Sequence, residues 1–272
     1  MLLGITGHRG ILAKSIIKYI KKNNKNNYKI SLYQHDILDY QKLEQWLKRV
    51  DIILHLAAIT SIKRVNKNKK YARRVNFESI EFIADFIKKT KTAKKFIFLS
   101  SSHVYGSSRK KISETNTKSP ISFYGYLKSI SEDKIQKNLS KYLIIRLFSY
   151  YSKFQTQDFL IPSIINKIKK NNYKKIKIKN HNHIRDISSV DFVAKQICEL
   201  IFKNSVGIIN CGSGKGIKIK DLVIKIAKLK FNKIVELDKR LKTKKITQLV
   251  SDNRKLQKIT GIDDKDNLFK YL

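Results

Sequence analysis

The sequence predicts an α/β fold, a doubly wound parallel sheet followed by a small C-terminal lobe. Short apolar runs that suit buried strands alternate with segments of helical periodicity, which is the pattern of such a sheet. The first run, residues 1–6, leads into a turn with two glycines and then into a helical pattern. The length of 272 residues, 42% of them hydrophobic, allows one large domain with a small lobe.

The turn after the first expected strand is the first candidate site. It reads Thr6-Gly7-His8-Arg9-Gly10-Ile11-Leu12-Ala13 and opens an expected helix. Glycines let the backbone approach a pyrophosphate, and a helix N-terminus supplies N–H groups and a dipole. We therefore expect the phosphates of a dinucleotide to contact Gly7, His8, Arg9, Gly10, Ile11 and Leu12, as in a Rossmann fold. A tight turn without a ligand is the alternative.

The second expected strand, residues 28–33, bears on which dinucleotide binds. NAD-binding units often place Asp or Glu at the end of this strand to hold the ribose hydroxyls. Here the strand ends in Gln34 and His35, with Asp36 beyond, and Arg9 is placed to face a 2′-phosphate. The sequence therefore tilts toward NADP(H) and leaves NAD(H) open. Asp39 is the expected N-cap of a helix over residues 40–49.

Two further apolar runs are expected to be buried strands whose carboxyl ends approach the site. Residues 51–58 end in Leu56-Ala57-Ala58, small residues that suit a close approach to a cofactor. A helix is expected over residues 71–90, followed by a strand at 95–99 that runs into Ser100-Ser101-Ser102-His103. Ligands of such sheets bind outside the carboxyl ends of the strands, so these serines are expected on the side of the glycine turn.

Tyr124 and Lys128 lie four residues apart in an expected helix, so their side chains share one face. An ordinary tyrosine has a pKa of about 10, too high for a base at neutral pH, and a nearby positive charge lowers that pKa. The pair is therefore expected to form a general acid/base. A solvated helix face is the alternative, since Tyr and Lys are both abundant in this chain.

The second half of the chain alternates less regularly. Strands are expected at residues 142–148, 175–179 and 207–210, helices at 157–170, 188–203 and after Gly216, and a loop at His183-Ile184-Arg185-Asp186. We expect residues 1–150 to form the dinucleotide-binding domain, which the chain rejoins at 181–212. Residues 151–180 and 213–272 are expected to form a substrate-binding lobe.

Composition and charge bear on other classes of function. The net charge of +38 favours binding to nucleic acid, but the lysines are spread along the chain among Asn and Ile, and no recognition-helix or RNP-like motif is present. The N-terminus lacks the features of a signal peptide, and no apolar run reaches the roughly 18 residues of a membrane span. Cys198 and Cys211 fit neither a metal knuckle nor a redox pair. We expect a cytoplasmic protein without a metal site.

In this order the motifs resemble the extended short-chain dehydrogenase/reductase family, the NAD(P)-dependent epimerase/dehydratase group that acts on nucleotide sugars. The segments that carry the resemblance are the glycine turn, Asp36-Ile37-Leu38-Asp39, His55-Leu56-Ala57-Ala58, Asn76, Ser101-Ser102-His103-Val104-Tyr105-Gly106, Tyr124-x-x-x-Lys128 with Glu132 downstream, His183-Ile184-Arg185-Asp186-Ile187 and Asn210-Cys211-Gly212-Ser213-Gly214. They cover most of the chain.

The resemblance implies roles for individual residues. Ser101 would hydrogen-bond the substrate oxygen, Tyr124 would exchange its proton, and Lys128 would hold the ribose and lower the tyrosine pKa. Besides the six residues of the glycine turn, the implied cofactor contacts are Asp36, Ile37, Leu56, Ala57, Ala58, Asn76, Leu99, Ser100, Tyr124 and Lys128. The implied substrate contacts are Thr60, Ser101, Ser102, His103, Ser149 and Arg185. Members of the family commonly form homodimers through helices that include the tyrosine helix.

The departures from the family pattern narrow the choice among the reactions that the family catalyses. Its dehydratases carry an Asp-Glu pair straight after the catalytic Thr, where this chain has Ser102 and His103. With no carboxylic acid there to expel a hydroxyl, the sequence disfavours a 4,6-dehydratase. The leading hypothesis is a nucleotide-sugar oxidoreductase that reduces a 4-keto sugar or epimerises carbon 4. A non-catalytic NAD(P)-binding sensor and a basic nucleic-acid-binding protein are the alternatives.

Overall fold

The centre of the molecule is a six-stranded parallel sheet. The computed structural model describes residues 1–272 except 24–26, 91–93, 171–174, 179, 238–246, 264–265, 267 and 272. The strands lie in the order β2 (Lys29–Leu32), β1 (Leu2–Thr6), β3 (Ile52–His55), β4 (Lys95–Ser101), β5 (Tyr142–Leu147) and β9 (Gly207–Cys211). Every neighbouring pair is parallel, which confirms the predicted doubly wound sheet.

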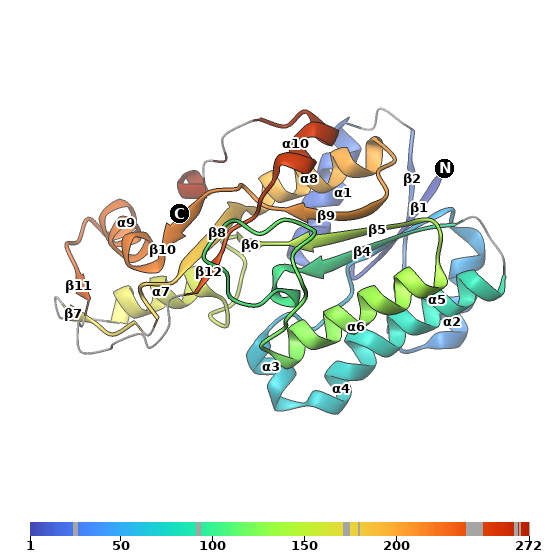
Figure 1. Ribbon diagram of the computed structural model, residues 1–272, viewed down its shortest axis with the longest axis horizontal. Helices are drawn as coiled ribbons and strands as arrows, with labels where there is room; N and C mark the ends of the chain where they lie inside the picture. Colours follow the sequence, from blue (N-terminus) through green and yellow to red (C-terminus); the bar gives the residue numbers. More distant parts are fainter. Residues whose placement is uncertain are drawn as a thin grey trace.

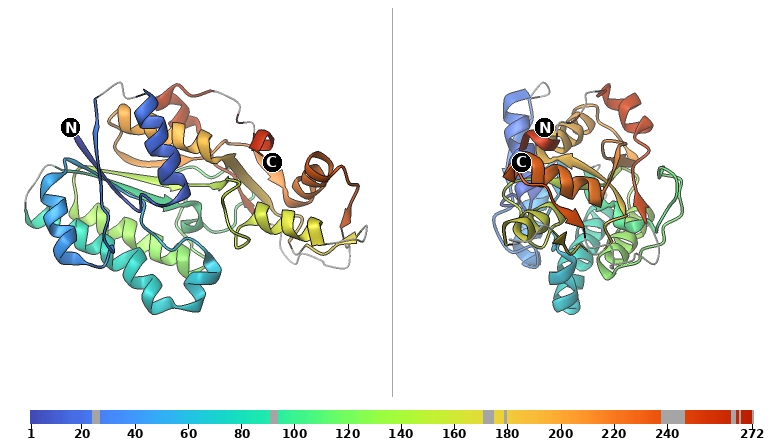
Figure 2. Two further views of the ribbon diagram at one scale, coloured as in Figure 1. Left: turned by 180° about the vertical axis from the view of Figure 1, so that it is seen from behind. Right: turned by 90° about the vertical axis from the view of Figure 1, so that its left-hand side faces the viewer.

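Helices cover both faces of this sheet (Figures 1 and 2). One face carries α1 (Ile11–Asn23), α8 (Val190–Phe202) and α10 (Arg254–Thr260), and the other carries α2 (Tyr40–Arg49), α5 (Ser79–Lys89) and α6 (Phe123–Asn138). Successive strand residues enter opposite cores, since Ile97 packs under the first set of helices and Phe96 and Phe98 pack under the second. Among the described residues, no helix has the length and apolar character needed to cross a membrane.

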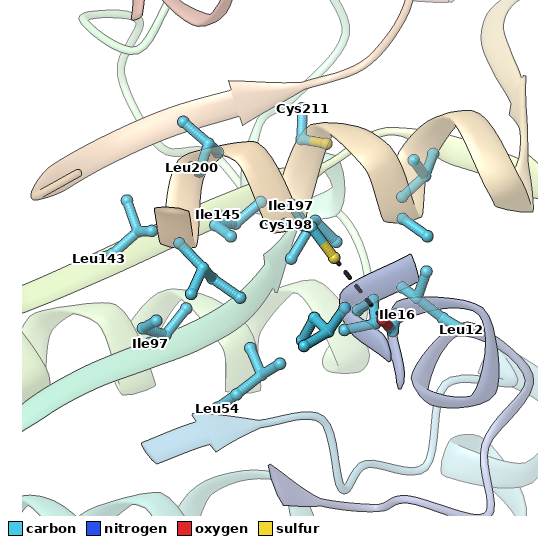
Figure 3. Close-up of a cluster of buried hydrophobic side chains, with 14 of the residues drawn as sticks. Leu12, Ile16, Leu54, Ile97, Leu143, Ile145, Ile197, Cys198, Leu200 and Cys211 are labelled. Carbon is cyan, nitrogen blue, oxygen red and sulfur yellow. Dashed lines mark hydrogen bonds between the residues drawn. The ribbon is translucent and has the colours of Figure 1, made fainter. Parts of the chain in front are cut away.

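The two cysteines belong to the core between the sheet and α8. Figure 3 shows Cys198 among Leu54, Ile97 and Ile145, with its thiol donating to the carbonyl oxygen of Ile16 at 3.7 Å. Cys211 donates to the side-chain oxygen of Gln196 at 3.1 Å. Burial raises the pKa of both thiols, so both stay neutral and serve as apolar core residues.

The predicted helix over residues 71–90 is confirmed as one uninterrupted helical stretch from Lys69 to Lys89, which contains a π turn that the sequence did not predict. After α3 (Ile62–Lys67), the chain forms α4 (Lys69–Arg73), a π-helical turn η1 (Arg74–Glu78) and then α5. Asn76 occupies the middle of the π turn, is completely buried, and offers its backbone oxygen to the Ser131 hydroxyl at 3.1 Å. The single extra residue in the turn lets Asn76 point toward the sheet edge, as π turns at functional sites often do.

A smaller set of elements lies beyond the carboxyl ends of β4 and β5 (Figure 1). Its central strand β8 (Ile184–Ser189) pairs with β6 (Ser149–Tyr151), β10 (Gly216–Lys218) and β12 (Gln248–Leu249). Farther out are α7 (Leu160–Lys170), α9 (Ile219–Phe231) and the pair β7 (Lys175–Ile176) and β11 (Glu236–Leu237). The described residues also form two 3₁₀ turns, η2 (Ser102–Val104) and η3 (Leu268–Tyr271). Of the predicted strand at 175–179, residue 179 lies outside the described residues.

The loop predicted at residues 183–186 was wrong, because most of that segment is the start of β8. Its polar composition does not prevent strand formation, since Asp186 lies inside with both carboxylate oxygens occupied. One oxygen accepts from the backbone and side chain of Ser213, and the other accepts from Gly214 and Ser251. The buried carboxylate therefore joins β8 to the turn after β9 and to the segment that follows β12.

Candidate active site

One face of α6 lies against the end of β4 and brings the three predicted catalytic residues together. Lys128 Nζ donates to the carbonyl oxygen of Leu99 at 2.8 Å. One turn later, Glu132 Oε1 accepts from the Ser100 hydroxyl at 2.5 Å. One turn earlier, the Tyr124 phenol lies close enough to the Ser101 hydroxyl for that hydroxyl to lower the pKa of the phenol. Three consecutive residues of the strand thus meet three helix residues spaced four apart.

A glycine lets the helix come this close. Ser122 caps the start of α6 by accepting from Gly125 N at 3.1 Å. A Cβ atom at Gly125 would overlap the carbonyl oxygen of His103 and would press on Pro120. Any other residue would push the first turn of α6 away from η2, and Tyr124 with it. The position of Tyr124 therefore depends on residue 125 being a glycine.

Burial controls the protonation of this cluster. It raises the pKa of Tyr124 to about 12, and the nearby Ser101 hydroxyl offsets only part of that rise. The sequence predicted that Lys128 would lower the pKa of Tyr124. In the chain without a cofactor, the pKa of Tyr124 is instead raised. Burial also lowers the pKa of Lys128 to about 7, against the opposing effect of Glu132. The ammonium also lies 4.5 Å from the centre of the Phe98 ring.

The glycine turn is held between the ends of β2 and β3. Gly7 has a φ of +68°, and a Cβ there would lie 2.6 Å from Ala57 N. The Thr6 hydroxyl accepts from the backbone of Leu56 and Ala57, and His8 Nδ1 lies 2.9 Å from the carbonyl oxygen of Tyr33. Arg9 and Gly10 are exposed, Ile11 is half-buried and Leu12 is buried as α1 begins. The turn thus presents its backbone, followed by a helix N-terminus, at the sheet edge.

The other predicted cofactor residues surround this turn. Asp36 is exposed and accepts from Leu38 N at 2.9 Å, while Ile37 is buried in the core. Asn76 Oδ1 accepts from Ile59 N at 2.8 Å, and its Nδ2 donates to Ile59 O at 2.9 Å. The asparagine therefore fixes the loop that contains Ala57, Ala58 and the exposed Thr60.

The predicted substrate residues differ in how near they lie to Tyr124. Ser102 is buried in η2, and the ring of His103 meets the Tyr124 ring edge-on at 5.8 Å. Burial and the charge of Arg185 lower the pKa of His103, so the two side chains are neighbours. Ser149 is exposed at the start of β6, and no contact within the described part of the chain joins it to the cluster.

Arg185 is a half-buried guanidinium whose partners are neutral. It donates to the carbonyl oxygen of Thr247 at 3.0 Å and to its hydroxyl oxygen at 2.9 Å, and its Nη2 lies 3.1 Å from His183 Nδ1. No carboxylate pairs with it among the residues that the structure describes. A cation held in place without an anion suits an anionic ligand.

A buried network behind the cluster was missed from the sequence. Arg146 on β5 forms a bidentate ion pair with Glu132, in which the shortest N–O distance is 2.7 Å. Its other nitrogen donates to Tyr105 OH at 2.7 Å, which in turn donates to Asn210 Oδ1 at 2.8 Å. An arginine within an otherwise apolar strand, with Glu132 one helical turn after Lys128, was the available signal. Tyr150 was missed as well, and its phenol is near enough to Tyr124 to raise the pKa of that residue.

The chain was compared with known proteins. The model of the GDP-mannose 4,6-dehydratase family matches residues 6–266. An uncharacterized UDP-glucose epimerase, YtcB, from Bacillus subtilis is 30% identical over 45% of this chain and 40% of its own length. The dTDP-D-glucose 4,6-dehydratase of Dictyostelium discoideum is 24% identical over 82% of this chain and 60% of its own. The chain thus spans about half the length of these curated relatives.

Solved structures share the fold at low sequence identity. RMD from Pseudomonas aeruginosa, in complex with NADPH, superposes with a TM-score of 0.86 at 19% identity, covering 99% of this chain and 95% of that one. A UDP-glucuronic acid 4-epimerase from Bacillus cereus, in complex with a UDP-sugar and NAD, gives 0.85 at 21% identity, covering 100% and 96%. With the family model matching nearly the whole chain, the protein belongs to the GDP-mannose 4,6-dehydratase family of the extended short-chain dehydrogenase/reductases, which are nucleotide-sugar enzymes.

Proposed function

We propose that the protein is an NAD(P)-dependent oxidoreductase that reduces a 4-keto nucleotide sugar or epimerises carbon 4. The observation that carries the proposal is the contact of one α6 face with the end of β4, which sets Tyr124 beside Ser101 with Lys128 one turn away. The two residues after Ser101 are a serine and a histidine, so no carboxylic acid is at hand to expel a hydroxyl. Elimination of water is therefore not proposed.

The glycine turn fits a dinucleotide. The backbone at Gly7 is packed so closely on Ala57 that no side chain fits, and the exposed Gly10 leaves the start of α1 open to a pyrophosphate. The cofactor is NADP(H) or NAD(H), and exposed Arg9 together with the absence of an acid at Gln34 and His35 favours the 2′-phosphate. When bound, the nicotinamide exchanges a hydride with a carbon of the sugar.

The residues of the chain supply the proton and the binding contacts. In the reductive direction, Tyr124 donates its proton to the sugar oxygen while Ser101 hydrogen-bonds the same oxygen. Burial keeps the phenol neutral, which is the form that a proton donor must have. Lys128 holds the nicotinamide ribose and is placed to stabilise the phenolate that remains. Arg185 meets the diphosphate of the sugar nucleotide, which provides the anion that it lacks.

A matched pair of tyrosine variants tests the assignment. Tyr124→Phe should reduce turnover at least about a thousandfold with unchanged dinucleotide affinity, because it removes only the exchangeable proton. Tyr126→Phe, two residues along and half exposed, should leave turnover within twofold. Turnover would be followed by nicotinamide absorbance on a panel of UDP-, GDP-, dTDP- and CDP-sugars. Full activity in Tyr124→Phe would disprove the mechanism, and dinucleotide binding without turnover on any sugar would favour a sensor.

A further inference from the structure

A buried histidine lies behind the two backbone segments of the expected dinucleotide site. His55 is the last residue of β3, is 1% exposed, and lies opposite Thr6, the last residue of β1. Its ring packs against the rings of Phe96 and Phe98 on β4, with ring centres 6.1 and 6.3 Å away. The histidine therefore lies beneath the site and has no part in the proposed proton transfer.

The Thr6 hydroxyl joins this histidine to the end of β3. The Thr6 oxygen accepts from Leu56 N at 3.2 Å and from Ala57 N at 3.3 Å. His55 Nδ1 lies 3.1 Å from the same oxygen. A hydroxyl oxygen has two lone pairs, and the two backbone N–H groups occupy both, so the hydroxyl proton points at Nδ1. His55 therefore accepts this proton at Nδ1, and the proton of its own neutral ring is on Nε2.

The other ring nitrogen is unfavourable for folding. His55 Nε2 is buried and has no hydrogen-bond partner among the residues that the structure describes. Burial, and after it the charge of Lys128, lower the pKa of His55 to about 3 against an opposing effect of the Ala57 backbone, so the ring stays neutral. A leucine would fill this space without an unpaired N–H group. Residues that are unfavourable for folding are expected mainly at functional sites, and His55 is such a residue.

The contact through Thr6 controls the spacing of the two cofactor segments. The backbone after β3 lies directly against the glycine turn, since a Cβ atom at Gly7 would lie 2.6 Å from Ala57 N. Without an acceptor at position 55, the Thr6 hydroxyl would be free to rotate, and its oxygen would leave the N–H groups of Leu56 and Ala57. These two residues would then no longer be fixed against the turn. A ligand that contacts both segments binds more weakly when it must first order them.

We propose that His55 is a positioning residue for the dinucleotide. By accepting the Thr6 proton, it directs the Thr6 oxygen at the backbone of Leu56 and Ala57 and so holds the end of β3 against the glycine turn. It acts through Thr6 and not by contact with the dinucleotide, because its side chain is buried in the core. This role rests on the proposed function, in which the glycine turn holds the dinucleotide.

Titration of the full chain with NADPH and with NADH, followed by fluorescence, tests this role. His55→Leu keeps much of the size of the side chain but removes the acceptor, so the affinity for the dinucleotide should fall about tenfold. The Tm of this variant should stay within about 2 °C of wild type, because an unpaired N–H group is lost together with a hydrogen bond. His55→Asn is the matched rescue: its Oδ1 can take the place of Nδ1, and it should bind within about threefold of wild type.

Thr6→Val tests the same connection from the other side. Valine keeps the shape of threonine but removes the hydroxyl, so binding should weaken at least as much as in His55→Leu. Adding His55→Leu to Thr6→Val should weaken binding no further, because the histidine then has nothing to act through. Losses that add, tighter binding by His55→Leu than by His55→Asn, or affinity that falls only where Tm falls would each overturn the proposal, because each indicates packing alone. A wild-type chain that binds neither dinucleotide would refute the proposed function and this role with it.

Discussion

Replacing Lys128 by methionine should make the protein more stable at neutral pH while removing its activity. The side chain is 2% exposed, and its ammonium has one carbonyl oxygen and one aromatic ring as neighbours. Burial lowers its pKa from 10.5 to about 7. Lowering the pKa by this much costs about 4 kcal/mol of folding free energy at pH 7 and about 2 kcal/mol at pH 9.

Methionine removes that cost and loses two contacts. The hydrogen bond to Leu99 O and the contact with Phe98 together offset about 2 kcal/mol. The net gain is then about 2 kcal/mol at pH 7, or about 4 °C in Tm, and near zero at pH 9. The sign follows from proton binding: between pH 7 and 10.5 the unfolded chain holds a proton at Lys128 that the folded chain lacks. Wild-type stability from this group therefore rises with pH, and the variant lacks that rise.

Thermal melts of both proteins at pH 7, 8 and 9 measure the difference. Lys134→Met is the control, since Lys134 lies on the same helix but is partly exposed and paired with Glu81 and Asp85. It should lower Tm slightly, because it removes two surface ion pairs. A Lys128→Met variant that melts below wild type at pH 7, or whose difference from wild type does not shrink toward pH 9, would refute the reasoning.

Three other substitutions test the contacts behind the site. Gly125→Ala should lower Tm and turnover together, because its Cβ would overlap His103 O, and turnover preserved at wild-type level would contradict the close packing of α6. Glu132→Gln should cost about 3–5 kcal/mol in urea unfolding, since it leaves the Arg146 guanidinium buried without its anion; a loss below 1 kcal/mol would show that the pair is not coupled. Asp186→Asn should lower the free energy of unfolding by at least about 3 kcal/mol in the same assay. The asparagine NH2 group would replace a carboxylate oxygen and would then face hydrogen-bond donors.

The sheet and the shared helix face of Tyr124 and Lys128 could be predicted from the sequence, because each depends on local order. Apolar runs such as residues 95–99 fix a buried strand, and the spacing of Tyr124 and Lys128 places both on one helix face whatever surrounds it. The N-cap at Asp39 was found for the same reason, since its side chain bonds to Lys42 only three residues away. Such features need no knowledge of distant contacts.

The features that the sequence did not predict correctly depend on contacts between segments that are far apart in the chain. Residues 184–186 look like a loop because they are polar, and they form a strand because Asp186 meets Ser213 and Ser251 far along the chain. The π turn around Asn76, which the sequence did not predict, involves contacts of Asn76 with Ile59 and Ser131. The direction of the Tyr124 pKa depends on how completely the fold buries the phenol, and spacing along the chain does not show burial.

The meeting of α6 with β4 also separates two kinds of change that the protein can tolerate. Ser101, Tyr124 and Lys128 are all positioned by one strand and one helix. Arg185 and the elements around β8 come from other parts of the chain. Under the proposed function, mutations around β8 can therefore alter the binding of the sugar nucleotide without disturbing Tyr124. The elements β6, α7, β8 and β10 lie outside the central sheet, so under the proposed function they are where relatives with different substrates are expected to differ.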